Sequence, residues 1–182
     1  GYITNLGLEE VNINILSLNA GSHTYYVGGV AGYNNGIISN SYVVGKIKVG
    51  NTPYVYAGGI VGYGSGQYEE VYTKGEIIVN AKYQVYAGGI VGQTGNSNIK
   101  NVYSTMDVIT SALEHSYVGG LVGYLYGNSQ MNGAYYIGNQ EHTGNGYIGS
   151  LIGYFERSEL KNSYTEGDFL VGRIYESKVL KT

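Results

Sequence analysis

The carboxylates of this 182-residue sequence are the side chains that could perform hydrolysis. A glycosidase places two of them about 5 to 10 Å apart across the scissile bond and raises the pKa of one. The candidates are Glu69 and Glu70 with Asp107, and Glu156 with Glu159. Neighbours on a strand point to opposite sides, which separates Glu69 from Glu70, and the segment around Glu156 is typical of a solvated turn. We therefore expect no enzymatic activity from this chain.

Metal and nucleophile chemistry also lack the residues that they need. His23, His115 and His142 occur singly, as solvated loop histidines do, and no His-Glu-x-x-His pattern is present. The sequence has no cysteine, which removes disulfides and thiolate ligands. The Gly-Ser-Gly segment at 64–66 has no partner base. We expect no catalytic residue, no metal and no cofactor.

The composition indicates an all-β chain that binds neither nucleic acid nor membranes. The sequence has 31 Gly, 22 Tyr, one Pro and no Trp, with 43% apolar residues to form a core. Glycine favours turns and tyrosine favours strands. The formal charge is −3, and 10 basic against 13 acidic residues leave no basic stripe for phosphates. No apolar run reaches about 18 residues, and any export leader is expected outside this sequence.

A block of six residues recurs along the chain and defines its organisation. The block at 28–33 (GGVAGY) is followed by similar blocks that begin at Gly58, Gly88, Gly119 and Gly149, at intervals of 30, 30, 31 and 30 residues. We expect its glycines to be structural, since glycine adopts positive φ without penalty and lets one coil lie close on the next. The spacing fits neither a dinucleotide-binding loop nor a Walker loop. The structural glycines are Gly28, Gly29, Gly32, Gly58, Gly59, Gly62, Gly88, Gly89, Gly92, Gly119, Gly120, Gly123, Gly149 and Gly153.

Two further blocks complete each unit. One ends in tyrosine, as in 38–42 (ISNSY), and the other alternates apolar and polar residues, as in 45–49, 75–79 and 167–171. Alternation indicates strands, so each unit of about 30 residues holds three short strands separated by turns. The fourth unit lacks a clean third strand at 138–142, where we expect a loop.

The repeat predicts an all-β fold, a right-handed parallel β-helix (β-solenoid) of about five coils. A propeller blade would need about 40 to 50 residues, which argues against the antiparallel alternative. We expect one domain over residues 1–182, cut from a larger protein. Its units are about 1–25 (partial), 26–55, 56–85, 86–116, 117–146 and 147–182.

Equivalent positions of successive units form columns along the axis. The column expected inside the coil is Leu6, Ser41, Val71, Val102, Ala134 and Ser163. The next residue in each unit gives an outward first tyrosine column, formed by Tyr42, Tyr72, Tyr103, Tyr135 and Tyr164. A second tyrosine column is formed by Tyr26, Tyr56, Tyr86, Tyr117 and Tyr147. Asn5, Asn40, Asn101 and Asn162, interrupted by Glu70 and Gly133, are expected at a bend, where their amides can bond to the backbone.

Two roles for the tyrosine columns remain open. Rings stacked at strand spacing stabilise adjacent coils by roughly 0.5 to 1 kcal/mol per pair, which is a structural role. A row of tyrosines can also offer a flat platform to a glycan or a protein partner, since each ring has an apolar face and a hydroxyl.

The repeated blocks resemble the GLUG motif, which is matched best by 120–123 (GLVG) and recurs in five units from about 26 to 172. Ser150 in place of the second glycine and Gln93 in place of the tyrosine depart from the pattern. Proteins with similar repeats are large bacterial secreted or wall-attached proteins, including immunoglobulin A-cleaving zinc metallopeptidases and adhesin-like chains. In those peptidases the repeats lie apart from the zinc centre, so the resemblance implies an extracellular location and an architecture.

Three functions follow as expectations. The first is a structural scaffold that positions flanking domains of a parent chain. The second is an adhesin or recognition module that binds a host protein or glycan through the tyrosine columns. The third is a carbohydrate-active enzyme, which would require a buried carboxylate pair in a groove.

Overall fold

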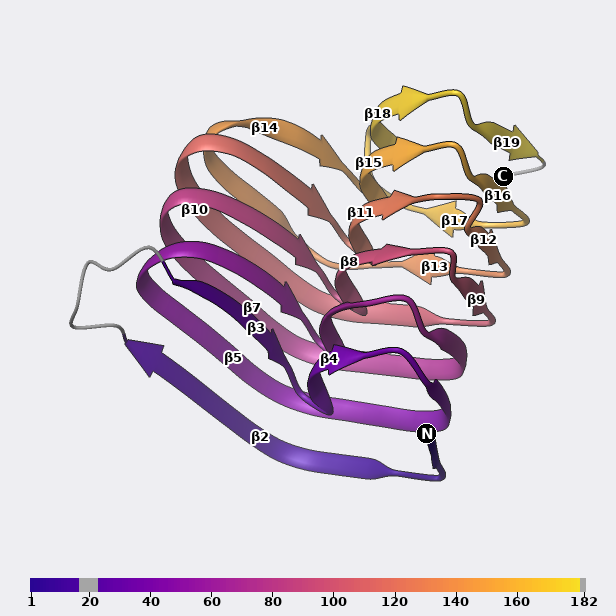
Figure 1. Ribbon diagram of the computed structural model, residues 1–182, viewed down its shortest axis with the longest axis horizontal. Coiled ribbons are helices and arrows are strands. Elements are labelled where there is room, and N and C mark those ends of the chain that lie inside the picture. Colours follow the sequence, from indigo (N-terminus) through magenta and orange to yellow (C-terminus); the bar gives the residue numbers. More distant parts are fainter. Residues whose placement is uncertain (17–22, 181–182) are drawn as a thin grey trace.

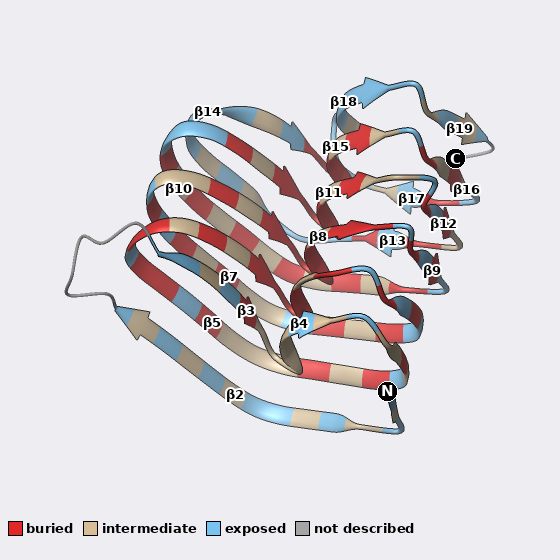
Figure 2. Ribbon diagram, in the orientation of Figure 1, coloured by how far each residue is buried: buried red, intermediate tan, exposed pale blue. Residues whose placement is uncertain are grey.

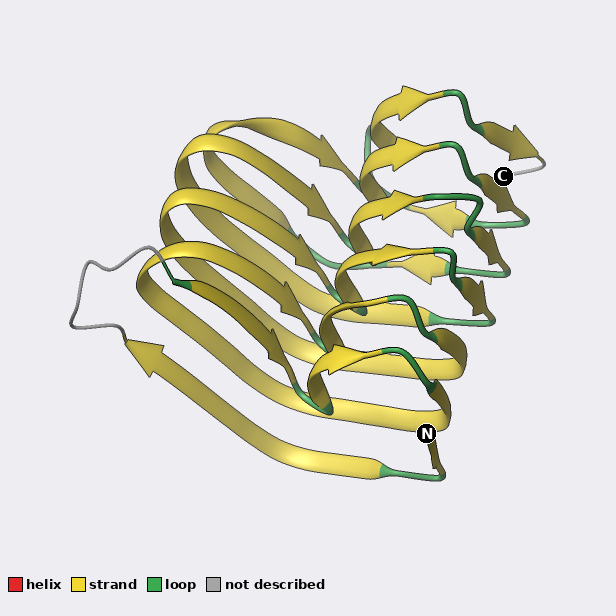
Figure 3. Cartoon of the chain, viewed as in Figure 1, coloured by secondary structure: helices red, strands yellow, loops and turns green. Residues whose placement is uncertain are grey.

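The computed structural model describes residues 1–16 and 23–180, which form strands and loops without a helix (Figure 3). The strands coil about a common axis, with the first and last coils at its two ends (Figure 1). Each pairing between described strands is parallel, and equivalent residues of successive coils lie opposite each other, as Tyr42, Tyr72 and Tyr103 do. The predicted parallel β-solenoid of about five coils of about 30 residues is therefore confirmed.

Two sheets wind around the axis, a long sheet of 13 strands and a short sheet of six. The short sheet consists of β4 (Ala31–Asn34), β6 (Val61–Gly64), β8 (Val91–Gly95), β11 (Val122–Tyr126), β15 (Ile152–Glu156) and β18 (Val171–Tyr175). The long sheet consists of β1 (Tyr2–Thr4), β2 (Gly7–Leu16), β3 (Thr24–Gly28), β5 (Ile37–Gly58), β7 (Gln67–Gly88), β9 (Asn98–Lys100), β10 (Tyr103–Gly119), β12 (Gln130–Asn132), β13 (Tyr135–Tyr136), β14 (Gln140–Gly149), β16 (Glu159–Lys161), β17 (Tyr164–Thr165) and β19 (Lys178–Leu180). Strands β5 and β7 are longer than the short segments expected, because each continues through its bends for 22 residues.

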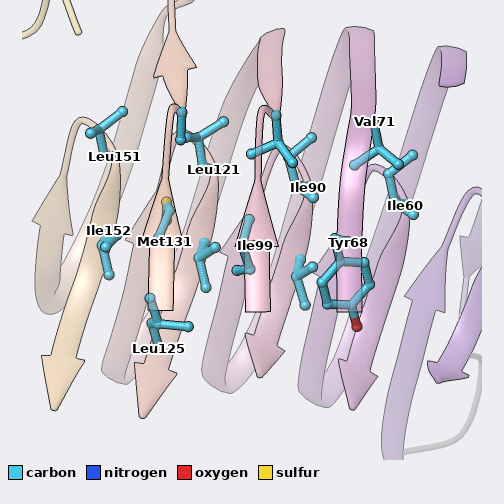
Figure 4. Close-up of a cluster of buried hydrophobic side chains, with 14 of the residues drawn as sticks. Ile60, Tyr68, Val71, Ile90, Ile99, Leu121, Leu125, Met131, Leu151 and Ile152 are labelled. Carbon is cyan, nitrogen blue, oxygen red and sulfur yellow. The ribbon is translucent and has the colours of Figure 1, made fainter. Parts of the chain in front are cut away.

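The interior contains two apolar clusters, which define two lobes (Figure 2). The short-sheet lobe is packed around Ile60, Ile90 and Leu121, which belong to successive coils (Figure 4). The long-strand lobe is packed around residues such as Ile47 and Ile77. Because the same position of each coil supplies the same kind of side chain, both clusters continue along the axis.

The column expected inside the coil is buried, apart from its first member at the N-terminal end. Leu6 is half-buried there. The buried members are Ser41, Val71, Val102, Ala134 and Ser163.

The paired glycines lie at a waist between the two lobes. A β-carbon at Gly59 would overlap the carbonyl oxygen of Gly89 in the next coil and would lie 2.8 Å from the side chain of Thr73 on the opposite wall. A β-carbon at Gly29 would lie 2.7 Å from Val43 in the same way. None of the paired glycines has a left-handed φ, so the expectation of positive φ is wrong for them. Glycine is required at the waist because no space remains for a side chain.

The asparagine column lies at a bend of the long sheet, and all of its positions are left-handed. The column is Asn5, Asn40, Glu70, Asn101, Gly133 and Asn162, with φ between 45° and 67°. The bend interrupts strand alternation, so Glu69 and Glu70 are both exposed instead of pointing to opposite sides. The backbone ladder continues through the bend, since the N–H of Asn101 donates to the carbonyl of Asn132 at 3.0 Å.

The fourth unit contains a strand where a loop was expected. Strand β14 pairs in register with β10, from Val108 opposite Gln140 to Gly119 opposite Gly149, with one irregularity after Ala112. The polar sequence hid this strand because its pairing partner supplies most of the apolar pattern.

The last coil is shorter than the others, which corrects the interpretation of 167–171 as a third strand. Tyr164 pairs with Tyr135 and Val171 pairs with Ile152, so 7 residues of the last coil span the path that 17 span in the coil before. Residues 169–172 (FLVG) therefore take the place of the glycine-rich turn. The last coil extends only the short-sheet lobe (Figure 1), and among described strands β14 pairs with β10 alone.

A ladder of serines supports the turn after the short sheet. The hydroxyls of Ser97, Ser129 and Ser158 each donate to a carbonyl of their own coil, at 3.1, 2.6 and 2.8 Å. Each hydroxyl of Ser129, Ser158 and Ser177 also accepts the N–H of the preceding serine, at 3.1, 3.2 and 3.1 Å. The ladder satisfies buried backbone groups that the turn leaves without a partner.

We predict that Ser129→Ala lowers the free energy of unfolding by about 2 kcal/mol, because it leaves the Ser97 N–H and the Tyr126 carbonyl unpaired. Thermal unfolding measures the loss as a fall in Tm of about 6 °C. Ser65→Ala is the matched control, since its hydroxyl bonds only to Asn35 at the surface. A change within about 0.5 kcal/mol is expected for it. Equal losses in the two variants would contradict the role of the ladder.

Candidate binding surface

The candidate carboxylates each bond to a nearby structural group. Glu69 pairs with Lys100 at 2.8 Å, and the Asp107 carboxylate accepts the N–H of Asn139 at 2.9 Å. Glu156 pairs with Arg157 at 2.7 Å. It also accepts a hydrogen bond from Tyr124, while Glu159 pairs with Lys161. The structure does not bring two of these carboxylates together across a groove lined by both.

The histidines are scattered, and one of them is not the solvated loop residue that was expected. His23 and His115 are exposed. His142 is half-buried in β14, with its Nδ1 atom 2.8 Å from the Thr110 hydroxyl, and burial lowers its pKa. The described residues contain no group of three or more His, Cys, Asp or Glu that could hold a metal ion. They also include no helix of the length and apolarity that would cross a membrane.

Four members of the first tyrosine column form a regular stack. The ring centroids of Tyr42 and Tyr72, of Tyr72 and Tyr103, and of Tyr103 and Tyr135 are 4.7, 4.9 and 4.8 Å apart, with interplanar angles of 11°, 1° and 2°. Each ring face inside the stack is covered by the next ring, so it presents only its edge and hydroxyl to solvent. The stack therefore consumes most of the flat surface that a platform would offer.

The two ends of this stack differ. The outer face of Tyr42 lies on Gly7, where a β-carbon would be 2.6 Å from the ring. At the other end, Tyr164 pairs with Tyr135 through the backbone, but among the described residues its ring makes no ring contact. The outer face of Tyr135 is free, and a hollow of about 430 Å³ opens beside it. The six residues that line it are Gly133, Ala134, Tyr135, Ile137, Asn162 and Tyr164.

A third tyrosine column, which the sequence analysis did not separate, faces the second one across the waist. It consists of Tyr33, Tyr63, Tyr124 and Tyr154 of the short sheet, with Gln93 in the place of one ring. Rings of the two columns contact each other, at 5.3 Å for Tyr26 and Tyr63 and 5.5 Å for Tyr117 and Tyr124. The signal was the tyrosine that ends most six-residue blocks.

The C-terminal end of this aromatic surface carries a cation. Arg173 pairs with Tyr154 in the next coil, and its guanidinium lies 4.9 Å from the ring centroid of Tyr147 and 5.6 Å from that of Tyr154. It also donates to the Tyr147 hydroxyl. A guanidinium over tyrosine faces stabilises the end of the aromatic surface.

Burial shifts the titration of several of these tyrosines. It raises the pKa of Tyr86 and of Tyr124, and Glu156 beside Tyr124 raises the latter further. Burial, with Tyr63 as the next contributor, raises the pKa of Tyr126 to about 12 from an ordinary value of 10.0. The hydroxyls stay protonated in the folded chain because their anions would lie in poorly hydrated surroundings close to one another.

We predict a loss of stability at high pH that depends on these hydroxyls. A tyrosine with a raised pKa in the folded state stabilises fully below its unfolded pKa of about 10, and this contribution falls as pH rises through about 12. Denaturant unfolding at rising pH measures the loss, and Tyr126→Phe should make it smaller. Tyr2→Phe, at an 81% exposed position, should leave the pH profile unchanged. A Tyr126→Phe profile that coincides with the parent would contradict the assignment.

Comparison with known proteins identifies the repeat. The family model described as "The GLUG motif" matches residues 23–48 and 83–109. Both matches include a glycine-rich turn and the long-sheet strand that follows or precedes it. No curated protein and no solved structure matches the chain. The chain thus carries a GLUG repeat region that is folded as a parallel β-solenoid.

Proposed function

We propose that this chain is a noncatalytic structural segment of a bacterial protein that is secreted or attached to the cell surface. The observation that carries the proposal is the in-register stacking of coils around two continuous apolar clusters. Such a rod keeps its ends at a fixed separation, because each coil is held by its neighbours along its whole length. The partners are the flanking domains of the parent chain, which we propose to be an immunoglobulin A-cleaving metallopeptidase or an adhesin.

The rigidity of the rod can be measured directly, because the sequence has no cysteine to interfere with labelling. Spin labels at Asn14→Cys in β2 and Lys178→Cys in β19 mark exposed positions near the two ends. A spacer gives one narrow distribution of distances between the labels. A broad distribution, with the circular dichroism of the folded chain retained, would overturn the spacer role.

The location has its own test. Antibodies against this chain should detect the parent protein in the secreted or cell-wall fraction of the producing cells. Detection only in the cytoplasmic fraction would overturn the proposed location and leave the rigidity result unaffected.

A second function, recognition of a host glycan or protein, is favoured by the exposed tyrosines. Tyr135 and Tyr164 are 38% and 55% exposed, and Tyr26 and Tyr33 are 44% and 57% exposed. Large aromatic side chains at the surface of a noncatalytic domain are typical of contact sites. A screen of glycans and host proteins that gives no binding would count against recognition.

A further inference from the structure

The end of the first tyrosine stack offers a vacant ring position. Four rings are spaced by 4.7 to 4.9 Å, and the fifth coil supplies Tyr164 in register, but its ring stands apart from the face of Tyr135. Its hydroxyl is 3.4 Å from the carboxylate of Glu166. A ring that enters the hollow would continue the stack by covering a face that water covers now.

The hollow is apolar on its floor and polar on its rim. Ala134, Ile137 and the two tyrosines supply apolar surface, and the left-handed Gly133 carries no side chain to fill it. Amides border the same place: the Asn162 amide donates to the Asn132 side chain at 2.9 Å, and a β-carbon on Gly133 would lie 2.7 Å from the Asn101 amide oxygen. Exposed amides hold further donors and acceptors that a ligand can use.

This combination distinguishes between two kinds of ring. An aromatic side chain of a partner would cover the Tyr135 face but would leave the amides and the Tyr164 hydroxyl without new partners, which costs affinity. A pyranose offers an apolar C–H face to the tyrosine and hydroxyls to the amides around it. We propose that the hollow between Tyr135 and Tyr164 binds a pyranose ring of a glycan. The proposal goes beyond the spacer role and specifies the alternative recognition role.

The test uses methyl pyranosides of glucose, galactose, mannose and N-acetylglucosamine as probes, with NMR of the chain labelled at its tyrosine rings. At least one probe is expected to shift the ring signals of Tyr135 and Tyr164. Tyr135→Ala should weaken that binding about tenfold. Tyr135→Phe keeps the ring face and should bind within about twofold of the parent.

Two variants keep the test independent of folding. Asn162→Gly removes the rim amide at a left-handed position where the column already accepts glycine, and it should weaken binding severalfold. Tyr42→Ala removes the opposite end of the same stack, whose outer face is covered by Gly7, and should leave binding unchanged.

Three outcomes would overturn the proposal. They are no shift with any pyranoside, equal weakening by Tyr42→Ala and Tyr135→Ala, or tighter binding of N-acetyltyrosine amide than of every pyranoside at the same signals. The last outcome would assign the hollow to an aromatic side chain of a protein. None of them bears on the distance between spin labels, so failure here is separable from failure of the spacer role.

Discussion

Gly59→Ala is expected to lower the free energy of unfolding by about 3 kcal/mol, at the upper end of what an added methyl group costs in a packed core. The β-carbon would overlap the carbonyl oxygen of Gly89 and would lie 2.8 Å from both Met106 Sδ and Thr73 Cγ2. The carbonyl cannot move away freely, because it accepts the Thr73 hydroxyl at 2.8 Å. Thermal unfolding should show a fall in Tm of about 9 °C.

Gly50→Ala is the matched control for this substitution. Its β-carbon would meet one neighbour, the end of the flexible Leu16 side chain at 3.0 Å, and its backbone is not left-handed. The change in stability should stay within about 0.5 kcal/mol. If Gly59→Ala were as mild as Gly50→Ala, the waist could not be the reason for the paired glycines.

The sequence was sufficient to predict the solenoid because its repeat is strict where the coils touch. The interval of about 30 residues, the glycine-rich turn and the buried column each depend on contacts between successive coils. A change at one of these positions would disturb two neighbours at once. Columns of equivalent residues, from Ser41 to Ser163, therefore gave the inside of the coil.

The errors arose where local geometry departs from ideal strands. Alternation separates Glu69 from Glu70 only in an extended chain, and the left-handed φ of 53° at Glu70 exposes both. The last coil was misread because 167–171 alternates like a strand, although its register with β15 makes it a turn. Strand β14, with the half-buried His142, was missed since its partner β10 specifies its conformation.

The candidate site was visible in the sequence only as a set of equal columns. Five tyrosines of the first column were equivalent by position, and nothing in their spacing separates Tyr135 from Tyr72. The difference arises from the short last coil, which turns after Thr165 and leaves the Tyr135 face without a fifth stacked ring. Most of the column is therefore structural, and its possible contact with a glycan is confined to one end.

The two phenylalanines of the chain provide a matched pair for the strength of the short-sheet lobe. Phe155 is 0% exposed in the cluster of that lobe, opposite Leu125 of the preceding coil, whereas Phe169 is 72% exposed in the short last coil. Phe155→Ala should cost about 4 kcal/mol through lost burial and a residual cavity. Phe169→Ala should change stability by less than about 0.5 kcal/mol.

The position of the loss should also be local. In a stack of coils each coil depends on its neighbours, so Phe155→Ala should first expose the amides of β15 and β18 to hydrogen exchange and leave the pairing of β5 with β7 protected. This pattern separates a cavity in one coil from general unfolding, because the latter would release all amides together. Uniform loss of protection would show that the rod unfolds as one unit, and a spacer of that kind would break all at once under load.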